Sequence, residues 1–186
     1  MPIISRNLFR SALVVIAFLS SAAIVGAQPR DYLTDPESEL IRFHQQLDKR
    51  IEVFIRAIDR RFAIINGGEQ VKTKRIEKGE PEWGDLPKGS RAELLRDVVG
   101  ILDAAISNID DVSQHDEKSP LISRSLRKLT AATNIYVTQL NTLASQTKDP
   151  DEIAAIEHAL ENARQIIEAG SKLPPPSTEK SKKDKP

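Results

Sequence analysis

The chain has 186 residues, and its Lys plus Arg equal its Asp plus Glu at 27 each. A chain of this length has room for one domain with a hydrophobic core, and its balanced charge excludes nucleic-acid binding driven by a large positive surplus. The absence of cysteine excludes disulfides, Cys-ligated zinc, iron–sulfur clusters and covalently attached haem.

The first 27 residues have the pattern of a secretory signal peptide. Arg6 and Arg10 precede an uncharged apolar run over residues 11–24, and residues 25–27 are small, as signal peptidase requires. We predict export and cleavage before Gln28, which would give a periplasmic or secreted protein. A membrane anchor through an uncleaved leader is the alternative, although the run is slightly shorter than the roughly 20 residues of a spanning helix.

Residues 28–36 form a polar lead-in, after which the periodicity predicts a first helix over 37–65. Its apolar side chains fall within roughly 100° of one another on a helical projection; they are Leu40, Phe43, Leu47, Ile51, Phe54, Ile58, Phe62 and Ile65. Arg60 and Arg61 lie in the last turn, where they would complement the helix dipole. Asn66-Gly67-Gly68 should end the helix.

Residues 69–89 are irregular, rich in glycine and proline, and contain the single tryptophan, Trp83. A connection of this length inside a compact domain is often functional or a crossover. A tryptophan in such a segment commonly packs over an open end of the core, whereas an exposed tryptophan would be an anchor for a partner protein. We therefore favour core packing for Trp83, and in the alternative interpretation it is the candidate partner contact.

Residues 91–114 form the most apolar predicted helix, whose hydrophobic side chains cover roughly 160° of its surface. Ser90 and Glu93 are spaced as a capping box at its start. A helix that apolar needs partners on more than one side, so it should be the centre of the domain.

Two further helices are predicted over 120–145 and 150–169. Ser119-Pro120 and Asp149-Pro150 supply a cap and a first-turn proline for each. The first has a regular three-four spacing, given by Ile122, Leu126, Leu129, Thr133, Tyr136, Leu140 and Leu143. In the second, Ile153, Ile156, Leu160, Ala163 and Ile167 continue that spacing until Gly170. Short connections predict that the last three helices are successive antiparallel neighbours.

Residues 171–186 are rich in proline and lysine and predict a disordered tail. Its lysines could make weak contacts with anionic surfaces.

No catalytic, cofactor or metal motif emerges from the sequence. His44, His115 and His158 fall on different sides of their predicted helices, so they do not converge on one interior site. None is preceded by the Glu-x-x-His spacing of a di-iron bundle. We predict a satisfied histidine at the edge of the core for His44, and no cofactor.

The sequence thus predicts an all-α protein, an up-and-down bundle of four long helices with an irregular connection between the first two. We predict a non-enzymatic interaction or scaffold module of the cell envelope or secreted space, which binds another protein and no nucleic acid. A bundle-type carrier of a small apolar ligand or a metal is the alternative. A signal-anchored membrane-attached protein comes third, and homo-oligomerisation is a further possibility.

Overall fold

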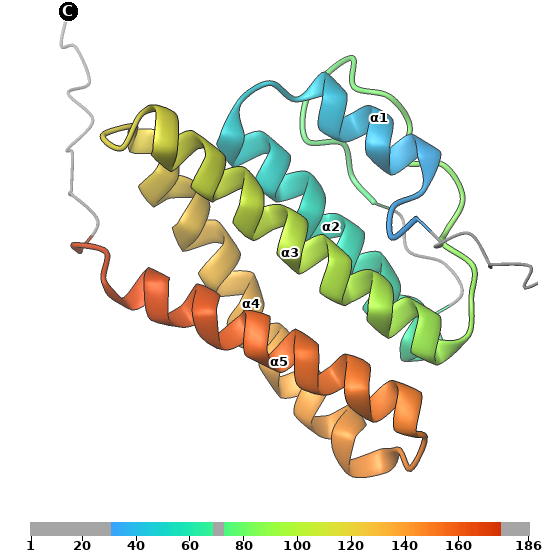
Figure 1. Ribbon diagram of the computed structural model, residues 1–186. Coiled ribbons are helices and arrows are strands. Elements are labelled where there is room, and N and C mark those ends of the chain that lie inside the picture. The colour runs from blue at the N-terminus through green and yellow to red at the C-terminus, as the bar shows by residue number, and fades with distance from the viewer. Residues whose placement is uncertain (1–30, 69–72, 176–186) are drawn as a thin grey trace, which may run out of the picture. The chain divides into compact units, whose positions relative to one another are not determined.

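The computed structural model describes residues 31–68 and 73–175, which belong to one compact unit. Within these residues it contains five helices and no strand (Figure 1), which confirms the all-α class. The helices are α1 (Asp35–Phe43), α2 (Leu47–Ile65), α3 (Arg91–His115), α4 (Pro120–Gln146) and α5 (Pro150–Ser171). None of them is long and apolar enough to cross a membrane. The predicted signal segment and residues 176–186 of the predicted tail lie outside the described residues.

The predicted single helix over residues 37–65 is wrong, because the chain breaks into α1 and α2 at residues 44–46. His44 and Gln46 adopt extended backbone angles, and Phe43, expected on the core stripe, is 41% exposed at the end of α1. The break turns α1 back onto α2 (Figure 1). Leu40 consequently packs with Val53 on a side of α2 separate from the main core.

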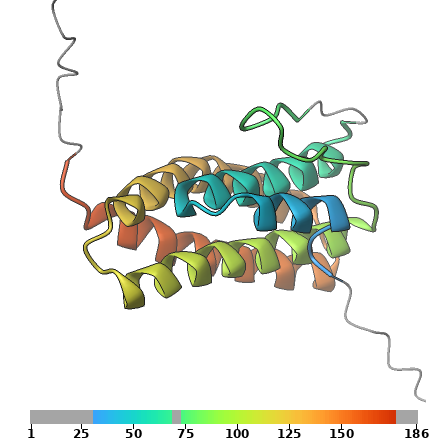
Figure 2. The same cartoon turned by 90° about the horizontal axis from the view of Figure 1, so that it is seen from above.

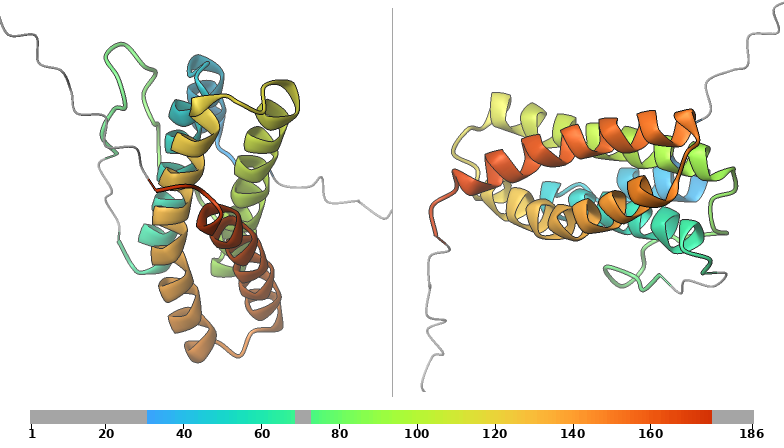
Figure 3. Two further views of the ribbon diagram at one scale, coloured as in Figure 1. Left: turned by 90° about the vertical axis from the view of Figure 1, so that its left-hand side faces the viewer. Right: turned by 90° about the horizontal axis from the view of Figure 1, so that it is seen from below.

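The four long helices make a square in which α2 and α5 each pack on both α3 and α4. Helices α3 and α4 touch much less, although only a short turn joins them, so they lie across a diagonal (Figure 3). The prediction that the last three helices are successive neighbours is therefore wrong for α3 and α4. Short turns can join diagonal helices, so loop length alone does not determine adjacency.

Contacts between helices show how the chain runs. Asp48 near the start of α2 contacts Lys128 near the start of α4, and Tyr136 further along α4 contacts Asp59 further along α2. These two helices are therefore parallel. Arg61 late in α2 faces Asp97 early in α3, which makes α2 and α3 antiparallel, and Figure 1 shows α4 and α5 antiparallel as well.

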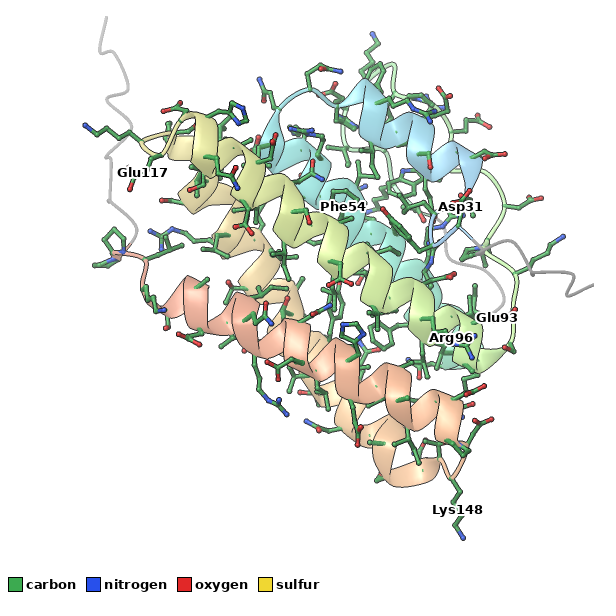
Figure 4. All side chains as sticks on the ribbon, viewed as in Figure 1. Asp31, Phe54, Glu93, Arg96, Glu117 and Lys148 are labelled. Carbon is green, nitrogen blue, oxygen red and sulfur yellow. The ribbon has the colours of Figure 1, made fainter. Side chains whose placement is uncertain are left out.

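The main core lies between the four long helices and is formed by aliphatic side chains together with Phe54, Phe62 and Tyr136. In Figure 4, Phe54 lies among the helices, whereas Glu117 and Lys148 project from the two turns at opposite ends of the unit. The predicted α4 positions from Leu126 to Leu143 are buried. This confirms the three-four pattern there.

The interior face of α5 differs from its prediction. Ile153 is exposed, and the buried set is instead Ala155, Ile156, Ala159, Asn162, Ala163 and Ile166. Because α5 packs on both α3 and α4, the buried arc falls between two neighbours and is lined by small residues. Gly170 is inside the helix rather than after it, and a Cβ there would collide with Thr130 of α4.

The predicted caps are confirmed at two of three helix starts. Ser90 and Glu93 form a reciprocal capping box, and the Asp149 carboxylate accepts from the backbone N–H groups of residues 151 and 152. Ser119 makes no side-chain capping hydrogen bond. Helix α1 begins with a further capping box, which was not predicted, between Thr34 and Glu37.

Candidate functional site

Trp83, the candidate partner contact, lies inside the protein and is 5% exposed. The connection between α2 and α3 passes along the α1–α2 side of the unit (Figure 2), and Trp83 packs there against Leu40 and Val53. The guanidinium carbon of Arg60 lies 5.5 Å from the ring centroid, close enough for a cation–π contact. This burial corresponds to the favoured interpretation, in which the tryptophan covers part of the core. A partner contact through Trp83 stays a prediction. It would require the connection between α2 and α3 to move so that the buried ring becomes exposed.

Beneath Trp83 lies a cluster of buried charges centred on Glu37. One carboxylate oxygen, Oε2, accepts from the Thr34 backbone N–H at 3.0 Å. The other, Oε1, lies 3.2 Å from Arg60 Nε and 2.5 Å from Arg61 Nη1. All three charged side chains are almost completely buried. A single carboxylate thus caps α1 and contacts two adjacent arginines of α2.

Arg60 and Arg61 are therefore not dipole-complementing surface residues, as their position in the last turn had indicated. Arg61 also donates to the backbone oxygens of Ala57 and Tyr32 at 3.0 and 2.8 Å, and it pairs with Asp97 of α3. Arg60 donates to the backbone oxygens of Gly84 and Asp85. Burial lowers the pKa of Arg60, and the Glu37 carboxylate opposes that shift. These contacts tie α1, α2, α3 and the connection together.

A second polar cluster surrounds His44 at the break between α1 and α2. The imidazole is buried, with Nε2 3.0 Å from Glu80 Oε2 and Nδ1 3.7 Å from Glu77 Oε1. Glu80 also accepts from the backbone N–H groups of Ile76 and Glu77. Burial would raise the pKa of Glu80, but the hydrogen bonds from these two N–H groups and from His44 lower it on balance. His44 is thus a hydrogen-bonded histidine of the interior, as predicted.

The remaining histidines are not near this cluster. His115 is exposed and contacts the Asp111 backbone oxygen at 2.7 Å, and His158 is exposed on α5. In the described part of the chain, no group of three or more His, Asp or Glu side chains is arranged to hold a metal ion. Tyr136 donates to Asp59 Oδ1 at 2.8 Å and to the Ile55 backbone oxygen at 3.0 Å. Burial, followed by the Asp59 carboxylate, raises the pKa of this hydroxyl, which therefore acts as a donor between α4 and α2.

An open apolar groove lies between α3, α4 and α5, near the α3–α4 turn that Glu117 marks in Figure 4. Its volume is about 340 Å³. Its aliphatic lining consists of Ile106, Ile109, Ile122, Leu126, Leu129 and Ile166, with Ala169 beside them. Asp110, Ser113 and Gln165 supply its polar groups. The groove suits apolar side chains of a partner, or a small apolar molecule. One carboxylate and two neutral polar groups of the lining would lie beside the bound group.

This groove could not be predicted from the sequence, because it depends on how α3, α4 and α5 are placed together. The available signal was the excess of large aliphatic side chains in α3, whose apolar arc is wider than one neighbour can cover. The buried role of Arg60 and Arg61 had no local signal, since their partners Glu37 and Asp97 are far away in the sequence.

The sequence matches no protein-family model, and the searches of curated proteins and of solved structures found no match.

Proposed function

We propose that the protein is an exported, non-enzymatic interaction or scaffold module. Helices α2–α5 would form an up-and-down four-helix bundle, to which α1 and the connection are added along one side. In this proposal the groove between α3, α4 and α5 binds the apolar face of an amphipathic helix from another protein. The export part of the proposal rests on the signal pattern of residues 1–27.

The groove is the observation that carries this proposal. Its aliphatic side chains come from three helices; Ile106 and Ile122 are partly exposed, and the buried Ile109, Leu126, Leu129 and Ile166 form the rest of the lining. Such a concave apolar surface suits the i, i+3 and i+4 anchors of a docking helix. Asp110 is the one charged residue of the lining. A basic residue beside the apolar anchors of the partner would therefore be complementary to it.

The non-enzymatic part of the proposal is supported by the contacts of the buried ionisable groups. Glu37 and Asp97 pair with Arg60 and Arg61, and His44 and Glu80 lie in contact inside the unit. These pairs hold helices and the connection together, and they do not line the groove. The groove contributes an apolar surface without a nucleophile and base in contact.

A carrier of a small apolar ligand is the second candidate, and the size of the groove favours it. Its volume of about 340 Å³ falls in the range of small-molecule sites, roughly 300–1,000 Å³. Such a ligand would be aliphatic, with a hydrogen-bonding or cationic group placed near Asp110 and Gln165.

Site-specific photo-crosslinking in the native host tests the interaction proposal. A photoreactive residue replaces Ala169, which is exposed at the groove, and, as a control, Ala131, which is exposed on α4 and does not line it. We expect a defined protein adduct at position 169 alone, which a second substitution, Ser113→Arg at the groove, abolishes. Adducts of equal strength at both positions, or at neither, would contradict a partner in the groove.

A native mass spectrum of the protein recovered from the host tests the other parts of the proposal. A mass beginning at Gln28 supports export with cleavage, whereas retention of residues 1–27 in the membrane fraction supports the anchored alternative. Additional mass that is lost on denaturation, and reduced by Ser113→Arg, supports the carrier. The same spectrum reports a homo-oligomer if one forms.

A further inference from the structure

The end of the unit at which α3 stops carries a concentration of negative charge. Residues 110–118 hold one lysine and four acidic side chains, all exposed, namely Asp110, Asp111, Asp116 and Glu117. Within the described residues none of the four pairs with a lysine or an arginine, and the imidazole of His115 lies 3.7 Å from Asp111. Because the last turn of a helix carries partial negative charge, carboxylates close to it are unfavourable. A bound positive group would offset this arrangement.

The chain leaves α5 at this same end of the unit. Arg91 and Arg96 in the first turns of α3 pair with Glu152 and Asp151 in the first turn of α5. The two helices therefore run parallel. Figure 1 shows their last turns on the same side of the unit, which is also the side on which α4 starts.

The described part of the tail is attached close to the groove. Leu173 packs against the main core, and the Pro174 backbone oxygen accepts from Arg127 of α4. Ala169 in the last turn of α5 lines the groove together with Asp110 of the acidic end. The groove thus borders both the end of α5, from which the tail continues, and the acidic end of α3.

Residues 176–186 have the charge and the length to reach the acidic end. They lie outside the described residues and hold four lysines against two acidic residues, a net charge of +2. Fully extended at about 3.3 Å per residue, they span about 35 Å, whereas a helix with its side chains is only about 10–12 Å wide. The lysines can therefore pass the start of α4 or the end of α5 and reach the carboxylates of α3.

We propose that residues 176–186 bind the acidic end of α3 and thereby cover the opening of the groove between α3, α4 and α5. This inference rests on the proposed function, because the groove is the site at which the partner docks. The covering segment belongs to the same chain, so its effective concentration is on the order of millimolar and weak ion pairs suffice. A partner helix with a basic residue near Asp110 displaces the lysines and takes their place.

A spin label in the tail of the protein recovered from the host tests the contact without knowledge of the partner. The chain has no cysteine, so Ser181→Cys provides a single attachment site for a nitroxide, which broadens the NMR signals of nearby backbone amides. We expect broadening at residues 110–117 and none at residues 147–149, at the opposite end of the unit. The broadening should be strong at about 0.01 M salt and lost at about 1 M, at which charges are screened within about 3 Å.

Two matched double variants show whether the carboxylates of the acidic end hold the tail. Asp116→Asn with Glu117→Gln removes two of them, and the broadening should fall about threefold, the equivalent of one or two exposed ion pairs. Glu157→Gln with Glu161→Gln removes two exposed carboxylates of α5, and the profile should stay as in the wild type. All four positions are exposed, so both variants should keep the fold, which circular dichroism checks.

Nile red, an uncharged apolar dye, tests whether the tail covers the groove. Replacement of the four tail lysines by glutamine should lower the dissociation constant of the dye about threefold, and Ser113→Arg at the groove should abolish binding with either tail. A flat broadening profile, a profile unchanged in the variant of Asp116 and Glu117, or equal dye affinity for the two tails overturns the inference. Absence of dye binding with either tail contradicts the groove site of the proposed function instead, and the spin label still decides whether the tail binds the acidic end.

Discussion

Helices α4 and α5 and the corner formed by α1, α2 and the connection are held together in different ways. The α4–α5 pair meets through regularly spaced apolar and small side chains, and its turn is capped locally by Asp149. The corner depends on buried charges that are distant in the sequence, such as Glu37 with Arg61. Apolar packing tolerates small displacements, whereas a buried charge that loses its partner is costly. Substitutions should therefore have larger and more pH-dependent effects in the corner.

The largest effect is expected for Arg61→Ala. The substitution leaves Glu37 with one arginine and removes a partner of Asp97, and breaking such a buried network costs about 3–5 kcal/mol. Urea unfolding followed by circular dichroism measures the loss. Arg164→Ala on α5, whose exposed side chain pairs with Glu161, is the control and should cost only about 0.3 kcal/mol. Similar losses for the two variants would show that the corner does not depend on its buried charges.

Trp83→Ala should destabilise the fold by about 3 kcal/mol, because it removes a large buried side chain from above Leu40 and Val53. The same urea titration measures it. Removal of an exposed anchor would instead weaken partner binding and leave stability nearly unchanged. A loss below about 1 kcal/mol would contradict the packed role, since surface substitutions fall in that range.

Gly84→Ala should cost about 2–3 kcal/mol through strain and collision together. Gly84 has a φ of +62°, and a Cβ there would lie 2.6 Å from the Pro36 side chain. Gly79 is a matched control, because its φ is +88° with no atom near a Cβ. Gly79→Ala should cost only the left-handed strain of about 1 kcal/mol. Thermal unfolding measures the stability of both variants. Equal losses of stability for Gly84→Ala and Gly79→Ala would mean that Pro36 moves away without cost.

Glu80→Gln should have the smallest effect of the four at neutral pH, about 1–2 kcal/mol, because the amide cannot replace all hydrogen bonds of the carboxylate. The folded-state pKa of Glu80 is lowered, so its carboxylate stabilises the fold above the ordinary glutamate range and loses this effect as the pH falls. The difference between wild type and variant should shrink below about pH 4. Urea titrations at pH 6 and pH 3.5 measure it, and a constant difference would contradict the charged role.

The same contrast explains which parts of the fold could be predicted from the sequence. The α4 seam and the Ser90 capping box depend on residues within a few positions of one another, so local periodicity and spacing were sufficient. The break after Phe43 has neither glycine nor proline, and its stabilising partner Glu80 comes from the connection. Helix propensity and periodicity depend only on residues close in the sequence, so they contain no information about such a partner and predicted one continuous helix.

The candidate site was less predictable than the fold. Trp83 was identified as a residue of interest from its type and setting, but whether it is covered depends on the turn of α1 onto α2, which was not foreseen. The groove requires the relative placement of three helices, and no single helix pattern contains that information. The shift of the α5 interior face towards Ala155 and Ala159 has the same origin, since it reflects packing on two neighbours at once.

The diagonal placement of α3 and α4 has a consequence for how the chain can be divided. The turn over residues 116–119 is the only covalent link between an α1–α3 half and an α4–α5 half, whose contact surfaces are long and apolar. Extensive apolar surfaces of this kind are typical of obligate heterodimers. Two chains separated at this turn should therefore reassemble by fragment complementation.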